Sequence, residues 1–154
     1  MVKLGIIGLG HMGNFHYSVS QMLPNVKLIG VADTVAKNLS QVKLPKIQKS
    51  NNYKDWIDKV DAVIIAVPTK LHYKIAKDCL IHGKHVLLEK PCANNLDHAR
   101  DLFKLAQDKN LILHIGHVER FNGAVQELHK IVEKPLFVEC KRMGPFAERI
   151  RDDG

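Results

Sequence analysis

A glycine-rich turn near the start of the chain, Gly8-Leu9-Gly10-His11-Met12-Gly13, constrains its fold more than any other feature. The turn follows an apolar run and opens an amphipathic stretch, which predicts a strand before it and a helix after it. Twenty residues beyond Gly13, Asp33 follows a second apolar run. A strand, a glycine-rich turn, a helix, a second strand and an acid, in this order, are the pattern of a dinucleotide-binding βαβ unit.

Each glycine of the turn has a separate steric role in such a unit. Gly8 allows a sharp bend, Gly10 lets the backbone touch a pyrophosphate, and Gly13 lets the helix pack close to the strand. The backbone N–H groups at the start of the helix, around His11 and Met12, would face the phosphates together with the positive end of the helix dipole. We therefore predict that these five residues bind the pyrophosphate of a dinucleotide.

Asp33 is the residue from which we predict which dinucleotide is bound. Its carboxylate can accept hydrogen bonds from the ribose hydroxyls and would repel a 2′-phosphate, so the sequence favours NAD over NADP. The glycine pattern alone also occurs in turns that bind no ligand. Here the flanking strand, the helix and the acid stand at the expected offsets, and this context favours binding.

Apolar runs and amphipathic stretches alternate over residues 1–120, which indicates a parallel sheet with helices on both faces. The predicted fold class is α/β, a doubly wound parallel sheet of the NAD(P)-binding Rossmann type. Thr69 is predicted to cap one helix, whose buried stripe would be Leu71, Ile75 and Cys79. The predicted strands cover residues 2–8, 26–32, 46–49, 61–67, 85–89 and 111–115.

The pattern changes after residue 120. An amphipathic helix is predicted first, with Phe121, Val125 and Leu128 on one face. Residues 136–142 then alternate between apolar and polar, which is typical of a strand covered on one face in an antiparallel sheet. We expect residues 121–154 to begin a second, α+β domain that is incomplete in this chain. The unpaired edge of its strand would pair with a partner chain, which predicts a homo-oligomer.

The net charge and the cysteine content limit which classes of partner and which cellular compartment the sequence favours. The net charge of +7 comes from scattered lysines without a basic block or interleaved aromatic side chains, so nucleic-acid binding is not predicted. A positive field would suit an anionic cofactor, and a solvated basic surface is an equally open interpretation. No segment is long enough to cross a membrane. The three cysteines lie far apart and indicate neither a disulfide framework nor a metal site, which suits the cytoplasm.

Further candidate residues follow the predicted strands, where the carboxyl ends of parallel strands form the ligand-binding edge. Lys90 follows the fifth strand, and a lysine in a partly dry cleft can exchange a proton with a substrate hydroxyl. Pro91 would hold Lys90 in an extended conformation. The alternative is a surface lysine paired with Glu89. His72 could equally line the cleft or pack in the interior.

Three motifs, in this order and spacing, resemble the glucose-fructose oxidoreductase/inositol 2-dehydrogenase/MocA family. The resemblance covers essentially residues 1–145, and the Glu-Lys-Pro element is its most specific part. A shorter motif, residues 116–122, resembles a subgroup of nucleotide-sugar dehydrogenases of the UDP-N-acetylglucosamine 3-dehydrogenase kind. The three motifs are the glycine turn with His16, Ala66-Val67-Pro68-Thr69 with His72, and Gly83-Lys84-His85-Val86 with Glu89-Lys90-Pro91.

The resemblance implies NAD(P)-dependent oxidation of a hydroxyl of a sugar, nucleotide sugar or cyclitol, with Lys90 as the catalytic residue. The family also carries an Asp-x-x-x-His element in its second domain, and this chain ends at Gly154 before such an element. The alternative function is therefore a non-catalytic NAD-binding module that senses redox state or scaffolds a partner. The remaining implied contacts are Ala66, Pro68, His72 and Glu89 with the cofactor, His16 and His117 with the substrate, and Lys90 and Arg120 with both.

Overall fold

The computed structural model describes residues 1–141 and 143. The chain folds into two compact units, Met1–Gly116 and His117–Gly154. The first unit holds the complete sheet, and the second begins directly after the last strand.

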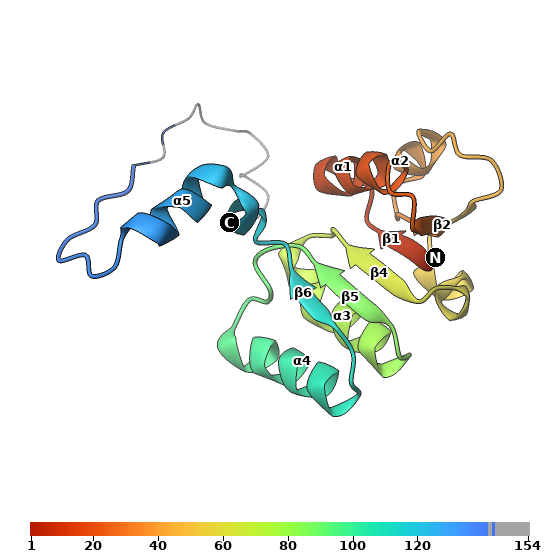
Figure 1. Ribbon diagram of the computed structural model, residues 1–154. Helices are drawn as coiled ribbons and strands as arrows, with labels where there is room; N and C mark the ends of the chain where they lie inside the picture. Colours follow the sequence, from red (N-terminus) through yellow and green to blue (C-terminus); the bar gives the residue numbers. More distant parts are fainter. Residues whose placement is uncertain (142, 144–154) are drawn as a thin grey trace. The chain divides into compact units, whose positions relative to one another are not determined.

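The first unit is built on one sheet of six parallel strands in the order β3-β2-β1-β4-β5-β6 (Figure 1). The order reverses between β1 and β4, so the sheet is doubly wound, and ligands bind such sheets at this switch point. All six predicted strands are present, with ends shifted by a few residues. The strands are β1 (Val2–Ile7), β2 (Val26–Ala32), β3 (Gln48–Ser50), β4 (Ala62–Ile65), β5 (His85–Leu88) and β6 (Leu113–Ile115).

Helices cover both faces of the sheet (Figure 1). Side chains alternate along β1, so that Leu4 and Ile6 pack toward Tyr17 of α1 on one face, while Ile7 packs toward α3 on the other. The helices are α1 (His11–Ser20), α2 (Ala36–Ser40), α3 (Thr69–Ile81) and α4 (Leu96–Asp108), with the short 3₁₀ turns η1 (Tyr53–Asp55) and η2 (Ile57–Lys59).

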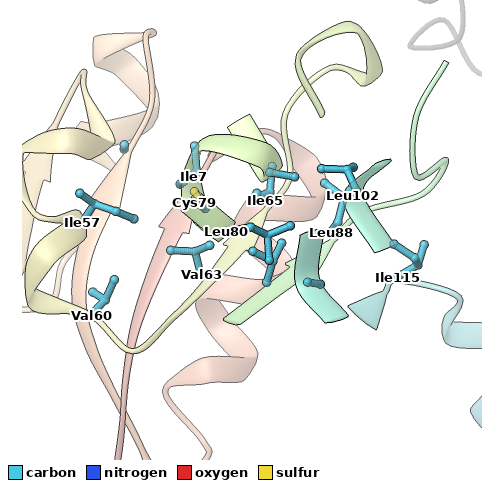
Figure 2. Packing of buried hydrophobic residues seen from close by; sticks show 14 of the residues in the cluster. Ile7, Ile57, Val60, Val63, Ile65, Cys79, Leu80, Leu88, Leu102 and Ile115 are labelled. Carbon is cyan, nitrogen blue, oxygen red and sulfur yellow. The ribbon is translucent and has the colours of Figure 1, made fainter. Parts of the chain in front are cut away.

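The larger of the two cores lies between the sheet and α3, α4 and η2 (Figure 2). Val63 and Ile65 of β4 meet Cys79 and Leu80 of α3 there, and all four side chains are buried. β4 is apolar on both faces because helices cover both, as in other central parallel strands. This packing fixes the start of α3 next to the ends of β4 and β5.

The buried face of α3 differs in part from the predicted one, since Cys79 is buried as predicted but Leu71 is not. Leu71 is 39% exposed and Ile75 is half-buried, whereas His72 is 1% exposed. The helix is therefore rotated by about one residue, because His72 finds hydrogen-bond acceptors inside the protein that its polarity alone does not reveal. The predicted cap is also wrong, since Thr69 is the first helical residue and Pro68 precedes the helix without a side-chain hydrogen bond.

The second unit contains one helix among its described residues. α5 (Gly123–Ile131) follows the 3₁₀ turn η3 (Val118–Phe121), and the Asn122 side chain caps it by accepting a hydrogen bond from the N–H of Ala124. The predicted strand at 136–142 is absent from its described part, 136–141, which is irregular. A lone strand leaves its backbone groups unpaired, so alternation alone does not form one. Residue 142 lies outside the described residues.

No helix within 1–141 has the length and apolarity needed to cross a membrane.

The burial of Cys79 gives a test of the core. All three cysteines of the described chain are free thiols, and burial raises the pKa of Cys79 to about 12. A raised pKa leaves less thiolate at pH 8, and only the thiolate is alkylated. We expect iodoacetamide to modify the exposed Cys140 at least ~10³-fold faster than Cys79 in the native protein. Peptide mass spectrometry checks this, and equal rates in the native protein would contradict the packing; in urea the rates should converge.

Candidate functional site

The glycine turn connects β1 to α1 at the carboxyl edge of the sheet. Gly8 has a φ of 89°, which side chains rarely allow, and a Cβ there would collide with the carbonyl oxygen of Ala66. A Cβ on Gly13 would collide with the carbonyl oxygen of Gly8. The turn can therefore close against β4 only with glycine at both positions, as their predicted steric roles require.

Gly10 lies at the open side of the same turn. It is exposed, and a Cβ built on it would have no described atom within 4 Å. α1 begins at the next residue, His11, and no described side chain caps its first N–H groups. Helix-start amides beside an open glycine fit a diphosphate, because they offer hydrogen-bond donors and the positive end of the dipole.

Asp33 directly follows β2 and holds the glycine turn in place. Its Oδ2 accepts hydrogen bonds from the Leu9 N–H at 2.6 Å and from Asn38 Nδ2 at 3.1 Å, and its Oδ1 accepts one from the Val35 N–H at 2.7 Å. A carboxylate has about four acceptor positions, so capacity remains for a ribose hydroxyl. Sequence reasoning missed the link to Leu9, which joins two segments 24 residues apart.

Glu89 follows β5 and lies inside the protein, with 6% of its surface exposed. Its Oε1 is 2.8 Å from His16 Nε2 on α1, and its Oε2 accepts the N–H of Lys90 at 3.2 Å. The carboxylate also packs closely against Gly116, since a Cβ added to Gly116 would lie 3.2 Å from the carboxylate atoms. Glu89 thus connects α1, β5 and the end of β6, and no local sequence pattern signals a contact between residues 73 apart.

Lys90 is exposed, and the bond between Lys90 and Pro91 is cis. The prediction placed this lysine in a partly dry cleft, whereas the described residues leave its side chain open to solvent at the sheet edge. Its backbone, in contrast, is held at both ends: Glu89 accepts its N–H, and His72 Nδ1 lies 2.7 Å from the carbonyl oxygen of Pro91.

This edge of the sheet therefore combines an open glycine turn with an uncapped helix start, the Asp33 carboxylate and an exposed lysine on a braced backbone. The sequence family described as "Oxidoreductase family, NAD-binding Rossmann fold" (Gfo/Idh/MocA) matches residues 2–117. The chain belongs to this family. The match covers the whole sheet and all the contacts described above.

Relatives in the Gfo/Idh/MocA family include dehydrogenases of sugars. The chain is 32% identical over 153 residues to UDP-N-acetylglucosamine 3-dehydrogenase of Acidithiobacillus ferrooxidans, covering 98% of this chain and 48% of the relative. The solved structure of that enzyme has a TM-score of 0.74 at 30% identity, over 84% of this chain and 43% of that one. The chain thus spans about half the length of the curated relatives it matches.

Other solved structures of this fold include one with NAD(H) bound and one with NADP⁺ bound. Apo scyllo-inositol dehydrogenase from Lactobacillus casei has a TM-score of 0.78 at 25% identity, over 85% of this chain and 41% of that one. Biliverdin reductase from Synechocystis, solved with biliverdin and NADP⁺, has a TM-score of 0.76 at 27% identity, over 84% of this chain and 42% of that one. Neighbours of this fold therefore do not decide between NAD and NADP.

The structure brings most of the predicted site residues to one edge. The glycine turn, Asp33, Ala66 and Pro68, and Glu89 with Lys90 all follow the carboxyl ends of β1, β2, β4 and β5. His117 and Arg120 belong to the second unit, where both are exposed. Their predicted contacts with cofactor or substrate, like those of His16 and His72, stay predictions.

Proposed function

We propose that this chain is the cofactor-binding part of an NAD-dependent dehydrogenase that acts on a hydroxyl of a sugar, nucleotide sugar or cyclitol. One observation carries the proposal: the open Gly10 cradle, the Asp33 carboxylate and Lys90 follow strands that end at the same sheet edge. A dinucleotide laid along this edge, with its diphosphate at Gly10 and its ribose at Asp33, would run toward the end of β5.

Lys90 is the proposed proton-exchange residue. Bound nicotinamide supplies the hydride acceptor, and the chain must then provide a group that takes the proton of the same hydroxyl. An amine on a four-carbon stem reaches well beyond the backbone that carries it. Because the described residues leave Lys90 exposed, we propose that substrate, cofactor and the rest of the full-length protein exclude water around it. His117 and Arg120 are proposed to contact the substrate or cofactor from the second unit.

Binding and turnover test this function separately. Titration calorimetry of the chain with NADH should give saturable binding, and the full-length protein should change the nicotinamide absorbance with UDP-sugars or inositols. Absence of dinucleotide binding would overturn the proposal. Binding without turnover by the full-length protein would favour the alternative, a module that senses or scaffolds without chemistry.

Asp33 is proposed to make the site prefer NAD. Its carboxylate would repel a 2′-phosphate, so Asp33→Ser should weaken NAD⁺ binding and lower the preference over NADP⁺ by roughly tenfold or more, which corresponds to at least about 1.4 kcal/mol. Calorimetry with both cofactors measures the ratio of the two dissociation constants. An unchanged ratio would contradict the role of Asp33.

Asp61 offers a matched control for this substitution. Its carboxylate also accepts a backbone N–H, that of Lys3 at 2.8 Å, but it precedes β4 at the opposite edge of the sheet. Asp61→Asn removes the same charge and should leave both dissociation constants unchanged. A shift of the cofactor ratio in this variant would mean that net charge, not position, sets the preference.

The proposal also covers a second domain, the oligomeric state and the cellular location of the protein. A unit that begins at His117 supports a second domain starting near residue 121. The homo-oligomer stays a prediction, because the strand on which it was based is not formed in residues 136–141. Free thiols at all three cysteines support a cytoplasmic location.

A further inference from the structure

We infer that His72 is a positioning residue for Lys90, an assignment that rests on the proposed function of Lys90. His72 belongs to the first turn of α3, is 1% exposed and lies 18 residues before Lys90. Its ring connects the loop after β4 to the loop after β5, which carries Lys90. A buried side chain on a packed helix can therefore hold the segment from which the lysine projects.

The ring of His72 lies between two backbone carbonyl groups. Its Nε2 is 2.8 Å from the carbonyl oxygen of Val67, and its Nδ1 is 2.7 Å from that of Pro91. Carbonyl oxygens only accept, so a neutral ring makes one of these bonds at a time and a protonated ring makes both. Either way, an apolar replacement would leave at least one of these carbonyl groups, on half-buried Val67 or exposed Pro91, without its donor and would release the link between the two loops.

Lys90 is thereby held on both sides. Upstream, Glu89 accepts its N–H and is itself fixed by His16 of α1. Downstream, His72 holds the carbonyl group of the next residue, Pro91. Both braces start from helices that pack on the sheet, so the backbone of Lys90 is tied to rigid elements.

The backbone is the part of Lys90 that the fold controls. The side chain is exposed, so the direction in which it leaves the backbone sets the space that the amine samples. Losing the contact with Pro91 would free this direction, while the diphosphate cradle after β1 and Asp33 after β2 keep their own contacts. Substitution of His72 should therefore change Lys90 without changing the cofactor cradle.

Backbone order at Lys90 is the first readout, measured by ¹⁵N relaxation on the chain itself. The order parameter of the Lys90 amide should be close to the rigid value of about 0.85 in the unsubstituted protein and should fall below about 0.6 in His72→Leu. His72→Gln, which restores one donor, should give an intermediate value and serves if the leucine variant does not fold. An unchanged order parameter in both variants would overturn the inference.

Leu80→Ala is the matched control. Leu80 is fully buried on the same helix, so its truncation also destabilises the core but leaves both contacts of His72 in place. The order parameter of Lys90 should stay at its unsubstituted value in this variant. A fall equal to that of His72→Leu would show that His72 acts only through overall stability, which would also overturn the inference.

Kinetics of the full-length protein give the second readout. His72→Leu should lower kcat by up to about 10²-fold, the effect expected from a misplaced reacting group, and leave KM for NAD within about twofold. Failure of the proposed function is distinguishable, because it would appear as full activity in Lys90→Ala. If His72→Leu made the Lys90 backbone mobile but left kcat unchanged, the positioning role of His72 would be overturned. The catalytic role of Lys90 would not be affected by that result.

Discussion

Lys90→Ala in the full-length protein should bind NAD as tightly as the unsubstituted protein and lose turnover by about 10²–10⁴-fold, the usual contribution of a general acid–base group. Binding should persist because the glycine turn and Asp33 follow β1 and β2, and neither contacts the Lys90 side chain through any hydrogen bond of the described residues. Calorimetry with NADH and the nicotinamide absorbance assay measure the two quantities.

Two further variants separate proton exchange from charge. Lys90→Arg keeps a positive charge at the same place, but a guanidinium does not give up its proton, so it should be as inactive as alanine. Lys104→Ala removes an exposed lysine from α4 and should keep full turnover. Recovery of activity in Lys90→Arg would mean that the charge, not the proton, is needed, and full turnover in Lys90→Ala would reject Lys90 as catalytic.

The parts of this site that sequence predicts are those with a local steric cause. Gly8 needs a positive φ and Gly13 needs close contact with the turn, and both requirements appear in the chain as glycine at fixed spacing. Five of the six strands are likewise visible as short, mostly apolar runs bounded by polar or turn-forming residues, whereas β3 consists of polar residues. Such signals do not depend on what the segment meets across the fold.

Contacts between distant segments are the parts that sequence does not predict. The pair of His16 and Glu89 and the double contact of His72 join residues that no local pattern relates. The predicted buried face of α3 is right for Cys79 and wrong for Leu71 for the same reason, because the burial of His72 depends on two carbonyl groups elsewhere in the chain. The exposure of Lys90 is also a property of its surroundings, not of the Glu-Lys-Pro motif.

Trp56→Ala should lower the free energy of unfolding by about 3–5 kcal/mol, a large part of the stability of a domain. The indole is 1% exposed and covers two glycines, Gly5 of β1 and Gly30 of β2, which are register partners. A Cβ on Gly30 would lie 2.5 Å from the ring, and one on Gly5 would collide with it. Urea unfolding followed by far-ultraviolet circular dichroism measures the loss, since the substitution removes the single tryptophan.

Trp56→Phe is the milder companion to this substitution. The indole Nε1 is buried and finds no acceptor among the residues that the structure describes. An unpaired buried donor costs about 1–3 kcal/mol, so phenylalanine loses packing volume but removes that cost. We expect Trp56→Phe to destabilise the protein much less than Trp56→Ala. Equal losses would mean that Nε1 has a partner.

A double-mutant cycle with Gly5 tests whether the ring and the two glycines form one packing unit. Gly5→Ala alone should destabilise by about 1–3 kcal/mol, because the new methyl group collides with the indole. In the Trp56→Ala background the same change should be neutral or stabilising by about 0.5–1 kcal/mol, since the methyl group enters the space left by the ring and alanine suits a strand better than glycine. Additive losses would contradict the contact. Coupling would show that the indole packs directly on β1, the strand whose end carries the glycine turn, from the sheet face covered by α3 and η2.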